Sequence, residues 1–411
     1  MTSVTGGLSM QGPLTGIRIV DLSTMLSGPY ATDLLGDLGA DVIKVEVPGS
    51  GDHTRSLQNR SGGMSSMFLN INRSKRSITL NVKEPKGRKV LLDLYRTADV
   101  VVQNFRPGVV DRLGIGYEAA ATVKPDIIFL SISGFGQSGP YAGRRVYDPI
   151  VQALSGLTTL QAGSDEDRPR LLRTILPDKV SAITASQTIL AALLARERQG
   201  IGQHIELSMI DSVLSFLWAS DMGAYTFADQ EVAPAQAASF IDLIYEAADG
   251  YMTVSTMSNK EWEALCLAAD RPELVTDVRF ATPSARDANV NERLQLVQEI
   301  IATRTVAEWT KVLDEFDVPN APALTRAQVI VDPQVVHNET IIETEHRVAG
   351  RLRQTRPPAR FSATPPGPPI GAPVLGEHTD EVLGELGYSL DDIGELRNNQ
   401  IIGESMVEVV P

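Results

Sequence analysis

Apolar runs alternate with amphipathic segments along the first third of the chain. Four runs place apolar residues on consecutive positions, which is typical of strands buried on both faces; they are IRIVDL at 17–22, DVIKVE at 41–46, DVVVQNF at 99–105 and DIIFLSIS at 126–133. Helical spacing is predicted between them, over 29–38 and 86–97. This alternation predicts an α/β fold in which helices cover a parallel sheet.

The most strongly helical segment is predicted at 178–198. It is opened by Asp178, which we place at the N-cap, and closed by Gly200 and Gly202. The next segment, IELSMIDSVLSFL at 205–217, is interpreted either as a largely buried helix or as a strand that turns into one. The regular pattern lapses over 221–239, and we predict a domain boundary there.

Residues from about 240 to 320 have the pattern of a smaller α+β unit. A hairpin is predicted over 243–256, because Asp249 and Gly250 supply a turn between two strand-like runs. Helices are predicted to follow at 260–269, 291–301 and 306–315. A Pro-rich run at 356–373 is too long for a tight turn. It is interpreted as a surface connector or as an arm that crosses to another domain or subunit.

Length, charge and cysteine content limit the classes of protein to which this chain can belong. The 411 residues predict two or three domains. The net charge is −14, from 37 basic and 51 acidic side chains, which argues against wrapping nucleic acid. A single cysteine, Cys266, cannot form an internal disulfide. The first residues lack a secretory pattern and no apolar window is long enough for a membrane span, so a cytoplasmic location is expected.

Familiar cofactor and metal motifs are missing or out of context. GFGQSG at 134–139 matches the spacing of a dinucleotide-binding loop, but Pro140 follows it and no clear helix comes next. The five histidines are dispersed, and no paired-cysteine, Walker or G-x-S-x-G sequence is present. We therefore expect no metal site, and the usual support for nicotinamide, hydrolase and phosphoryl-transfer chemistry is lacking.

A basic cluster stands out in this acidic chain. NRSKRS at 72–77 is continued by Lys83, Lys86, Arg88 and Lys89. Such a run is either a solvated face or a landing site for the phosphates of a nucleotide-bearing ligand. NFRPG at 104–108 ends a predicted strand, which is where open α/β sheets usually place ligands.

Among the carboxylates, Asp178 has two interpretations. It is a plain N-cap, or it is an ionised carboxylate favoured by the helix dipole and able to attack a reactive acyl group. Periodicity alone does not choose between them.

Taken together, the motifs resemble the class III CoA-transferase family, from about residue 12 to residue 400. That family includes formyl-CoA transferases, bile-acid and carnitine CoA-transferases and 2-methylacyl-CoA racemases. The matching segments, in family order, are GIRIVDLSTMLSGPYAT, LGADVIKVEVPGSGD, NINRSKRSITLNVK, ADVVVQNFRPGVVDRLG, SISGFGQSGPY, LPDKVSAITASQTILAALLARERQGIGQHIELSMIDSVL and APVLGEHTDEVLGELGYS.

The resemblance implies a Rossmann-like large domain from 1–225 and 325–411, an inserted small domain at 226–324, and a homodimer of two interlocked rings. It implies coenzyme A, carried as acyl-CoA, and a small carboxylic acid as substrates, with no permanently bound cofactor. The residues that match the family's CoA-binding positions, together with two cations of the basic cluster, are Leu26, Ser27, Arg73, Lys75, Lys83, Asn104, Phe105, Arg106, Arg112, Gly134 and Phe135.

Asp178 matches the family's catalytic aspartate. The implied reaction passes through a mixed anhydride and an aspartyl-CoA thioester on this side chain, which keeps the acyl group activated without ATP. Racemases of the family have a histidine where this chain has Tyr147, so CoA transfer is favoured over racemisation. Formyl-CoA-type members have an arginine at the position of Val47, and Arg73, Lys75 or Arg76 is expected to compensate. Alternatives are a 2-methylacyl-CoA racemase and a CoA-binding protein without turnover.

Overall fold

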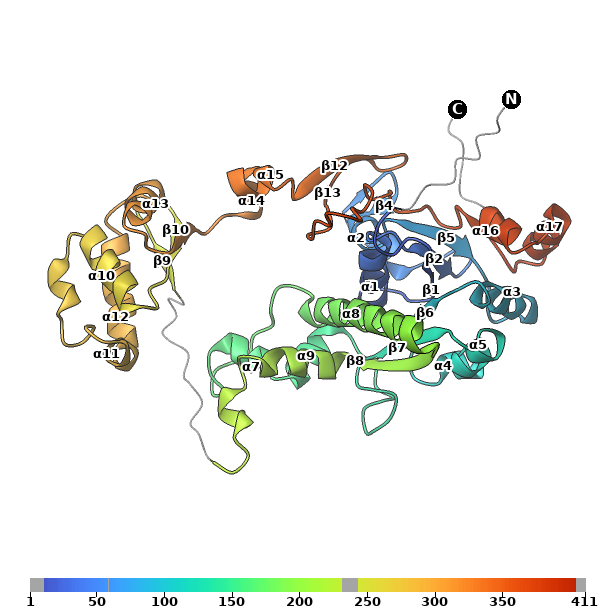
Figure 1. The fold of residues 1–411 in the computed structure, drawn as a ribbon, viewed down its shortest axis with the longest axis horizontal. Helices are drawn as coiled ribbons and strands as arrows, with labels where there is room; N and C mark the ends of the chain where they lie inside the picture. The colour runs from blue at the N-terminus through green and yellow to red at the C-terminus, as the bar shows by residue number, and fades with distance from the viewer. Residues whose placement is uncertain (1–10, 58, 231–242, 404–411) are drawn as a thin grey trace. The chain divides into compact units, whose positions relative to one another are not determined.

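The computed structural model describes residues 11–57, 59–230 and 243–403. These residues divide into two compact units, the first within 1–161, 168–230 and 339–411 and the second within 162–167 and 231–338 (Figure 1). The part of the predicted boundary at 231–239 lies outside the described residues. Among the described helices, none combines the length and the apolarity needed to span a membrane.

A six-stranded parallel sheet forms the centre of the first unit. Across the sheet the strands are β5 (Lys75–Thr79), β2 (Asp41–Glu46), β1 (Arg18–Asp21), β6 (Val100–Gln103), β7 (Ile128–Ser133) and β8 (Gln203–Ser208). Counted along the chain, this order is 3-2-1-4-5-6, as in Rossmann-type doubly wound sheets. The predicted α/β class and parallel sheet are confirmed.

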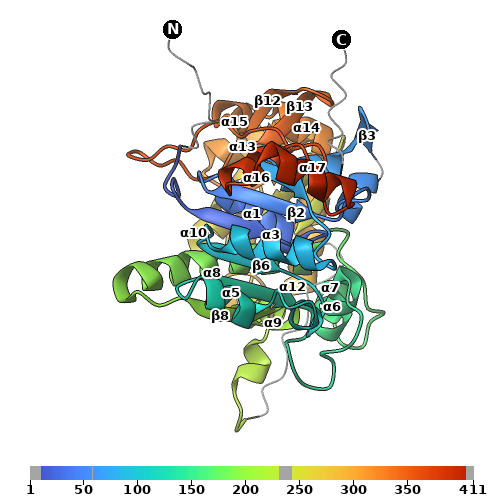
Figure 2. The same cartoon turned by 90° about the vertical axis from the view of Figure 1, so that its right-hand side faces the viewer.

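Both faces of this sheet are covered because its strands alternate apolar side chains between two cores. On one face, side chains such as Val20 and Val101 pack against helices α3, α4, α5, α16 and α17. On the other, side chains such as Ile19 and Val100 pack against α1, α6, α7, α8 and α9. Figure 2 shows α3 and α5 in front of the sheet.

The helices of the first unit are α1 (Ser27–Gly36), α2 (Ser66–Ile71), α3 (Pro85–Tyr95), α4 (Val109–Arg112), α5 (Tyr117–Val123), α6 (Asp148–Leu154), α7 (Leu157–Ala162), α8 (Leu176–Gln199), α9 (Met209–Trp218), α16 (Thr379–Glu385) and α17 (Leu390–Asn398). Two small hairpins add to it, β3 (Arg60–Ser61) with β4 (Met64–Ser65) and β12 (Ile341–His346) with β13 (Gly350–Thr355). The segment at 205–217 is a strand that turns into a helix, the second of its two interpretations.

The second unit combines a small antiparallel sheet with helices. Its sheet has the order β11 (Asn320–Pro322), β10 (Tyr251–Val254), β9 (Ile244–Glu246), and β9 and β10 form the expected antiparallel hairpin. Trp262, Phe280 and Trp309 fill its core. Its helices are α10 (Asn259–Ala268), α11 (Pro283–Ala288), α12 (Val290–Ile301), α13 (Val306–Glu315), α14 (Arg326–Val331) and α15 (Pro333–His337).

The Pro-rich run connects the β12–β13 hairpin to α16 and follows the edge of the central sheet for part of its length. The N–H of Ser74 donates to the Ile370 carbonyl at 2.8 Å, and the Arg55 guanidinium donates to the Pro373 carbonyl at 3.1 Å. Ala372 is buried against Phe68 in a small apolar cluster. Within the described residues, this run is therefore partly anchored to the first unit.

Candidate active site

A cavity of about 550 Å³ lies where β1, β6 and β7 end. From β1 the chain builds one half of the sheet outward to β5, and it then returns to build the other half from β6, which lies beside β1. Open α/β sheets bind ligands at this kind of switch point, here between β1 and β6. The volume is within the range of small-molecule sites. The lining residues are Thr24, Met25, Leu26, Ser27, Leu57, Met67, Asn104, Ile132, Ser133, Gly134, Val146, Tyr147, Asp148, Pro149, Gln152, Leu171, Leu172, Arg173, Thr174, Ile175, Asp178 and Met209.

The turn between β1 and α1 forms one wall of this cavity. Asn104 holds it across the switch point: its Oδ1 accepts the Thr24 N–H at 2.9 Å and its Nδ2 donates to the Thr24 carbonyl at 2.7 Å. A Cβ on Gly28 would lie 2.3 Å from the Ser23 Cβ, so only glycine lets α1 begin this close to β1. The turn thereby brings the first residue of α1, Ser27, to the cavity.

Asp178 lies in the first turn of α8, three positions after the N-cap, where the prediction had placed it. The N-cap is Ile175, and Pro177 occupies the start of the helix, where its missing N–H costs nothing. Because Ile175 occupies the N-cap, Asp178 is not the residue that caps α8. It instead accepts hydrogen bonds from the hydroxyl and the N–H of Ser27. The N-cap interpretation is therefore wrong, and Asp178 faces the cavity.

The electrostatic setting of Asp178 opposes its charge. Burial and the neighbouring Asp148 carboxylate raise the pKa of Asp178 to about 6, although the hydrogen bonds from Ser27 act in the other direction. Its side chain is only partly exposed. A carboxylate with a pKa near neutrality is poorly stabilised as an anion. Such perturbed groups are typical of active sites.

Asp148 and Gln152 are functional candidates that sequence reasoning missed. Asp148 begins α6, is 7% exposed, and accepts the Asp178 N–H at 3.4 Å. Burial raises its pKa, against the effect of a 2.6 Å hydrogen bond from Gln152 Nε2. Gln152 is 2% exposed and also accepts the Leu172 N–H at 2.9 Å. Thirty residues separate the two aspartates, so no local spacing marks the pair.

Four of the predicted CoA-binding residues line the cavity with Asp178: Leu26, Ser27, Asn104 and Gly134. A Cβ on Gly134 would lie 2.6 Å from Val146, so glycine keeps this wall thin. The seven other predicted binding residues lie outside the lining: Arg73, Lys75, Lys83, Phe105, Arg106, Arg112 and Phe135. Phe135 contacts the Tyr141 ring edge to face, and Phe105 packs on the core beneath α3.

Lys83, Arg106 and Arg112 are exposed. No ion pair involves any of the three within the described part of the chain. They follow β5 and β6, so they lie at the same end of the sheet as the cavity. Their positive charge is therefore available to bind a phosphate.

Arg73 and Lys75, in contrast, are inside the molecule, and we withdraw them as phosphate contacts. Arg73 is 5% exposed and pairs with Asp37 at 2.5 Å. Lys75 is 3% exposed, and its ammonium contacts Asp21 at 2.9 Å and the Asn72 amide oxygen at 2.9 Å. Carboxylates already neutralise both cations, so neither interpretation of this part of the cluster, a solvated face or a landing site, is correct.

The rest of the basic cluster is largely paired as well. Arg76 contacts Asp41, Glu381 and Glu385, and Lys86 and Lys89 each contact one carboxylate. Val47 is 60% exposed at the end of β2. The expectation that Arg73, Lys75 or Arg76 compensates for it is therefore wrong, because each is occupied elsewhere. Among the described residues, no group of three or more His, Cys, Asp or Glu side chains is placed to hold a metal ion.

A switch-point cavity in a doubly wound sheet, with a poorly stabilised carboxylate at a helix start, defines a ligand-binding α/β protein of the enzyme type. The model of CoA-transferase family III matches residues 14–379. The chain therefore belongs to CoA-transferase family III, and the predicted family is confirmed.

Similar proteins carry CoA-transferase names. A Fusarium pseudograminearum acyl-CoA transferase is 35% identical over 96% of this chain and 89% of its own. Human succinyl-CoA:glutarate CoA-transferase is 33% identical over 95% and 90%. An Escherichia coli formyl-CoA:oxalate CoA-transferase is 32% identical over 96% and 100%. Among solved structures, a CAIB/BAIF family protein from Brucella suis has a TM-score of 0.80 at 31% identity, covering 92% of this chain and all of that one.

Proposed function

We propose that this CoA-transferase moves CoA from an acyl-CoA donor to a carboxylic acid acceptor, with Asp178 as the nucleophile. The observation that carries the proposal is the Asp178 carboxylate itself. It faces a cavity of about 550 Å³, it is held by two donors of Ser27, and its pKa is raised to about 6. At neutral pH most of it is ionised, yet weakly stabilised, as a carboxylate nucleophile should be.

The reaction then has four attacks. The Asp178 carboxylate attacks the donor thioester carbonyl, which expels CoA thiolate and leaves a mixed anhydride. The thiolate attacks the aspartyl carbonyl, which releases the donor acid and leaves an aspartyl-CoA thioester. The acceptor carboxylate attacks this thioester, expels the thiolate and forms a second anhydride. The thiolate finally attacks the acceptor's acyl carbonyl, which gives the new acyl-CoA and restores the carboxylate.

Ser27 supplies donors for the charge that moves during these steps. Its hydroxyl and N–H already hydrogen-bond to the Asp178 carboxylate. When the aspartyl carbonyl is attacked, its oxygen becomes an oxyanion, and donors that are fixed before the reaction stabilise such charge without reorganising. The N-terminus of α8 adds a favourable dipole at the same place.

Phosphate recognition is proposed for Lys83, Arg106 and Arg112, the exposed cations of this end of the sheet. We also propose the interlocked homodimer and the discontinuous large domain that the family resemblance implies. Size-exclusion chromatography with light scattering tests the dimer.

Racemisation is the weaker alternative. It needs a second base near neutrality, and Tyr147, 64% exposed, stands where racemases have histidine. None of the described residues that line the cavity is a histidine. A racemase would also exchange the α-proton for deuterium from heavy water, which CoA transfer does not require.

The test is CoA exchange in a defined mixture. The protein is incubated with succinyl-CoA or acetyl-CoA and a panel of carboxylic acids, and new acyl-CoAs are detected by mass spectrometry. Hydroxylamine should trap the acylated Asp178. We expect Asp178→Ala to lower exchange by at least ~10³-fold, and Asp211→Asn, which changes an exposed aspartate on α9, to leave it unchanged. Tight CoA binding by the wild type without exchange would instead support a CoA-binding protein without turnover.

A further inference from the structure

Among the described residues that line the cavity, one is a cation. Of these residues, Asp148, Asp178 and Arg173 carry charge, and Arg173 alone is positive. Arg173 is exposed, and within the described residues it makes no ion pair and no hydrogen bond through its guanidinium. Arginine presents a planar fork of donors that fits a carboxylate in two-point contact. Its neighbourhood in the cavity leaves that fork open for a ligand.

The backbone at Arg173 is fixed on both sides by one buried side chain. Gln152 Oε1 accepts the Leu172 N–H at 2.9 Å, and Gln152 Nε2 donates to the Thr174 carbonyl at 3.3 Å. The same Nε2 donates to Asp148 at 2.6 Å. Gln152 thus ties the arginine-bearing loop to the carboxylate pair. This fixed backbone lowers the entropic cost of binding a ligand at Arg173.

Resting on the proposed function, we infer that the acid substrates of this enzyme are dicarboxylates, and that Arg173 binds the carboxylate that does not react. The reacting carboxylate becomes a neutral anhydride, so a two-point contact with arginine would be lost during attack and would hold back the reaction. The distant carboxylate keeps its charge throughout. Its contact with Arg173 lowers KM without a penalty in kcat.

Other side chains around the cavity agree with this assignment. Leu57, Met67, Leu171 and Leu172 provide apolar walls for the methylenes between two carboxylates. Lys179, in the first turn of α8, does not line the cavity, and its ammonium donates to the Thr174 hydroxyl at 2.8 Å. Arg173 is therefore the residue that distinguishes a second carboxylate from a methyl end.

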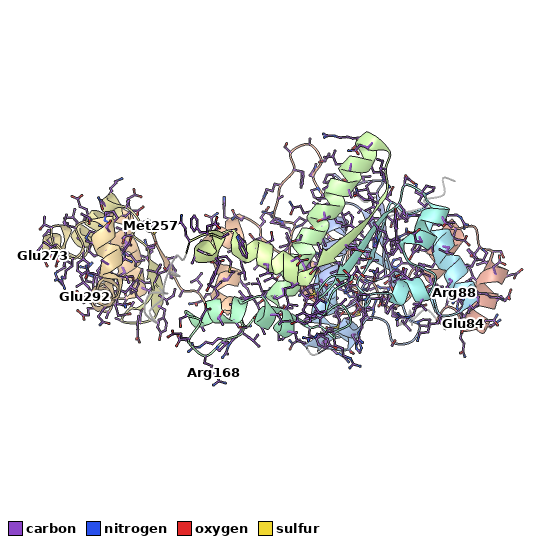
Figure 3. The ribbon with its side chains drawn as sticks, turned by 90° about the horizontal axis from the view of Figure 1, so that it is seen from below. Glu84, Arg88, Arg168, Met257, Glu273 and Glu292 are labelled. Atoms are coloured by element: carbon purple, nitrogen blue, oxygen red, sulfur yellow. The ribbon has the colours of Figure 1, made fainter. Side chains whose placement is uncertain are left out.

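The experiment compares glutarate with its monomethyl ester, which has the same chain but one charge fewer. Wild-type enzyme and Arg173→Met, with Arg173→Lys as the conservative variant, are assayed with succinyl-CoA as donor. Arg168→Met is the matched control, because Arg168 is an exposed arginine five residues earlier, outside the cavity lining, and its side chain points away from the ribbon in Figure 3.

We expect wild-type kcat/KM to be about 10- to 100-fold higher for glutarate than for the half-ester. Arg173→Met should remove this preference by raising KM for glutarate, with kcat and the half-ester nearly unchanged. Arg173→Lys should restore part of it, and Arg168→Met should match the wild type. Equal losses for both acids, or no wild-type preference, would overturn the assignment while leaving CoA transfer intact. Absence of exchange with every acid would overturn the proposed function and this inference together.

Discussion

Two clusters of charge flank the turn between β1 and α1, and they are built in opposite ways. In the interior cluster, each carboxylate has its own cation: Asp21 contacts Lys75 at 2.9 Å and Asp52 contacts Lys44 at 2.9 Å. Burial alone would raise the pKa of Asp21, but Lys75 and Lys44 outweigh it and hold that pKa well below its usual value. In the cavity cluster, Asp178 and Asp148 adjoin each other, and the pKa of Asp178 is raised to about 6.

The difference separates structure from chemistry. Paired buried charges satisfy one another and fix the backbone, as when the Lys44 ammonium also donates to the Ser23 carbonyl at 2.9 Å. Adjacent carboxylates destabilise one another and remain reactive. Aspartates of the same unit thus stabilise the turn in the interior cluster and provide a nucleophile in the cavity cluster.

The largest effect is expected from breaking the interior cluster. Asp21→Asn removes the carboxylate that pairs with the buried Lys75 ammonium, whereas Lys44 keeps Asp52, and should lower the free energy of unfolding by ~3–5 kcal/mol. Asp41→Asn is the matched control: Asp41 contacts Arg18 and Arg76 at 25% side-chain exposure and should cost at most ~1 kcal/mol. Urea unfolding monitored by circular dichroism measures both. Equal losses would show that burial of the pair does not matter.

In the cavity cluster, removing a charge should stabilise the protein. The pKa of Asp178 is higher in the folded state than its usual 3.8, so its contribution favours folding below pH 3.8 and is lost as the pH rises through 6. Asp178→Asn should therefore raise the free energy of unfolding by ~1–3 kcal/mol at pH 8 and by little near pH 4. Urea titrations at several pH values measure this difference, and a pH-independent effect contradicts it.

The smallest effect concerns the coupling within the cavity cluster. The first burst of CoA release reports the ionised Asp178, so its rate should rise with pH and level off above about 6. Asp148→Asn removes the neighbouring charge, so the rise in burst rate should occur at lower pH. The shift should go only part of the way to pH 3.8, because burial contributes more than Asp148 to the raised pKa of Asp178. Rapid-quench measurement of the burst tests this, with Asp211→Asn as control. If the burst rate of Asp148→Asn rises at the same pH as that of the wild type, the two carboxylates do not interact.

Much of the fold was predictable because apolar periodicity is local. The strand at 41–46 and the helix at 306–315 have the predicted bounds, and the other predicted elements of the two sheets and their helices shift by a few residues. The resemblance to the CoA-transferase family was equally well founded, since its motifs run through the chain in order and the family model matches residues 14–379.

Charge partners were not predictable, because they come together only through the fold. Arg73 and Asp37 are 36 residues apart, Lys75 and Asp21 are 54 apart, and Arg76 and Glu385 are 309 apart. A basic run in the sequence therefore became a set of internal ion pairs. Arg173 resembles Arg168 and Arg170 in sequence, and only the contacts of Gln152 distinguish its place.

Strand β5 lies at one edge of the central sheet, and its free side is covered by residues that come some 300 positions later in the chain. The Ser77 carbonyl accepts the His378 N–H at 2.9 Å, the Ser77 hydroxyl accepts the Gly376 N–H at 3.0 Å, and the Thr79 hydroxyl accepts the Gly403 N–H at 2.9 Å. An uncovered strand edge is a template for pairing with other chains. A chain that lacks residues 376–403 would leave this edge bare, so the late segment protects the sheet from pairing with other chains.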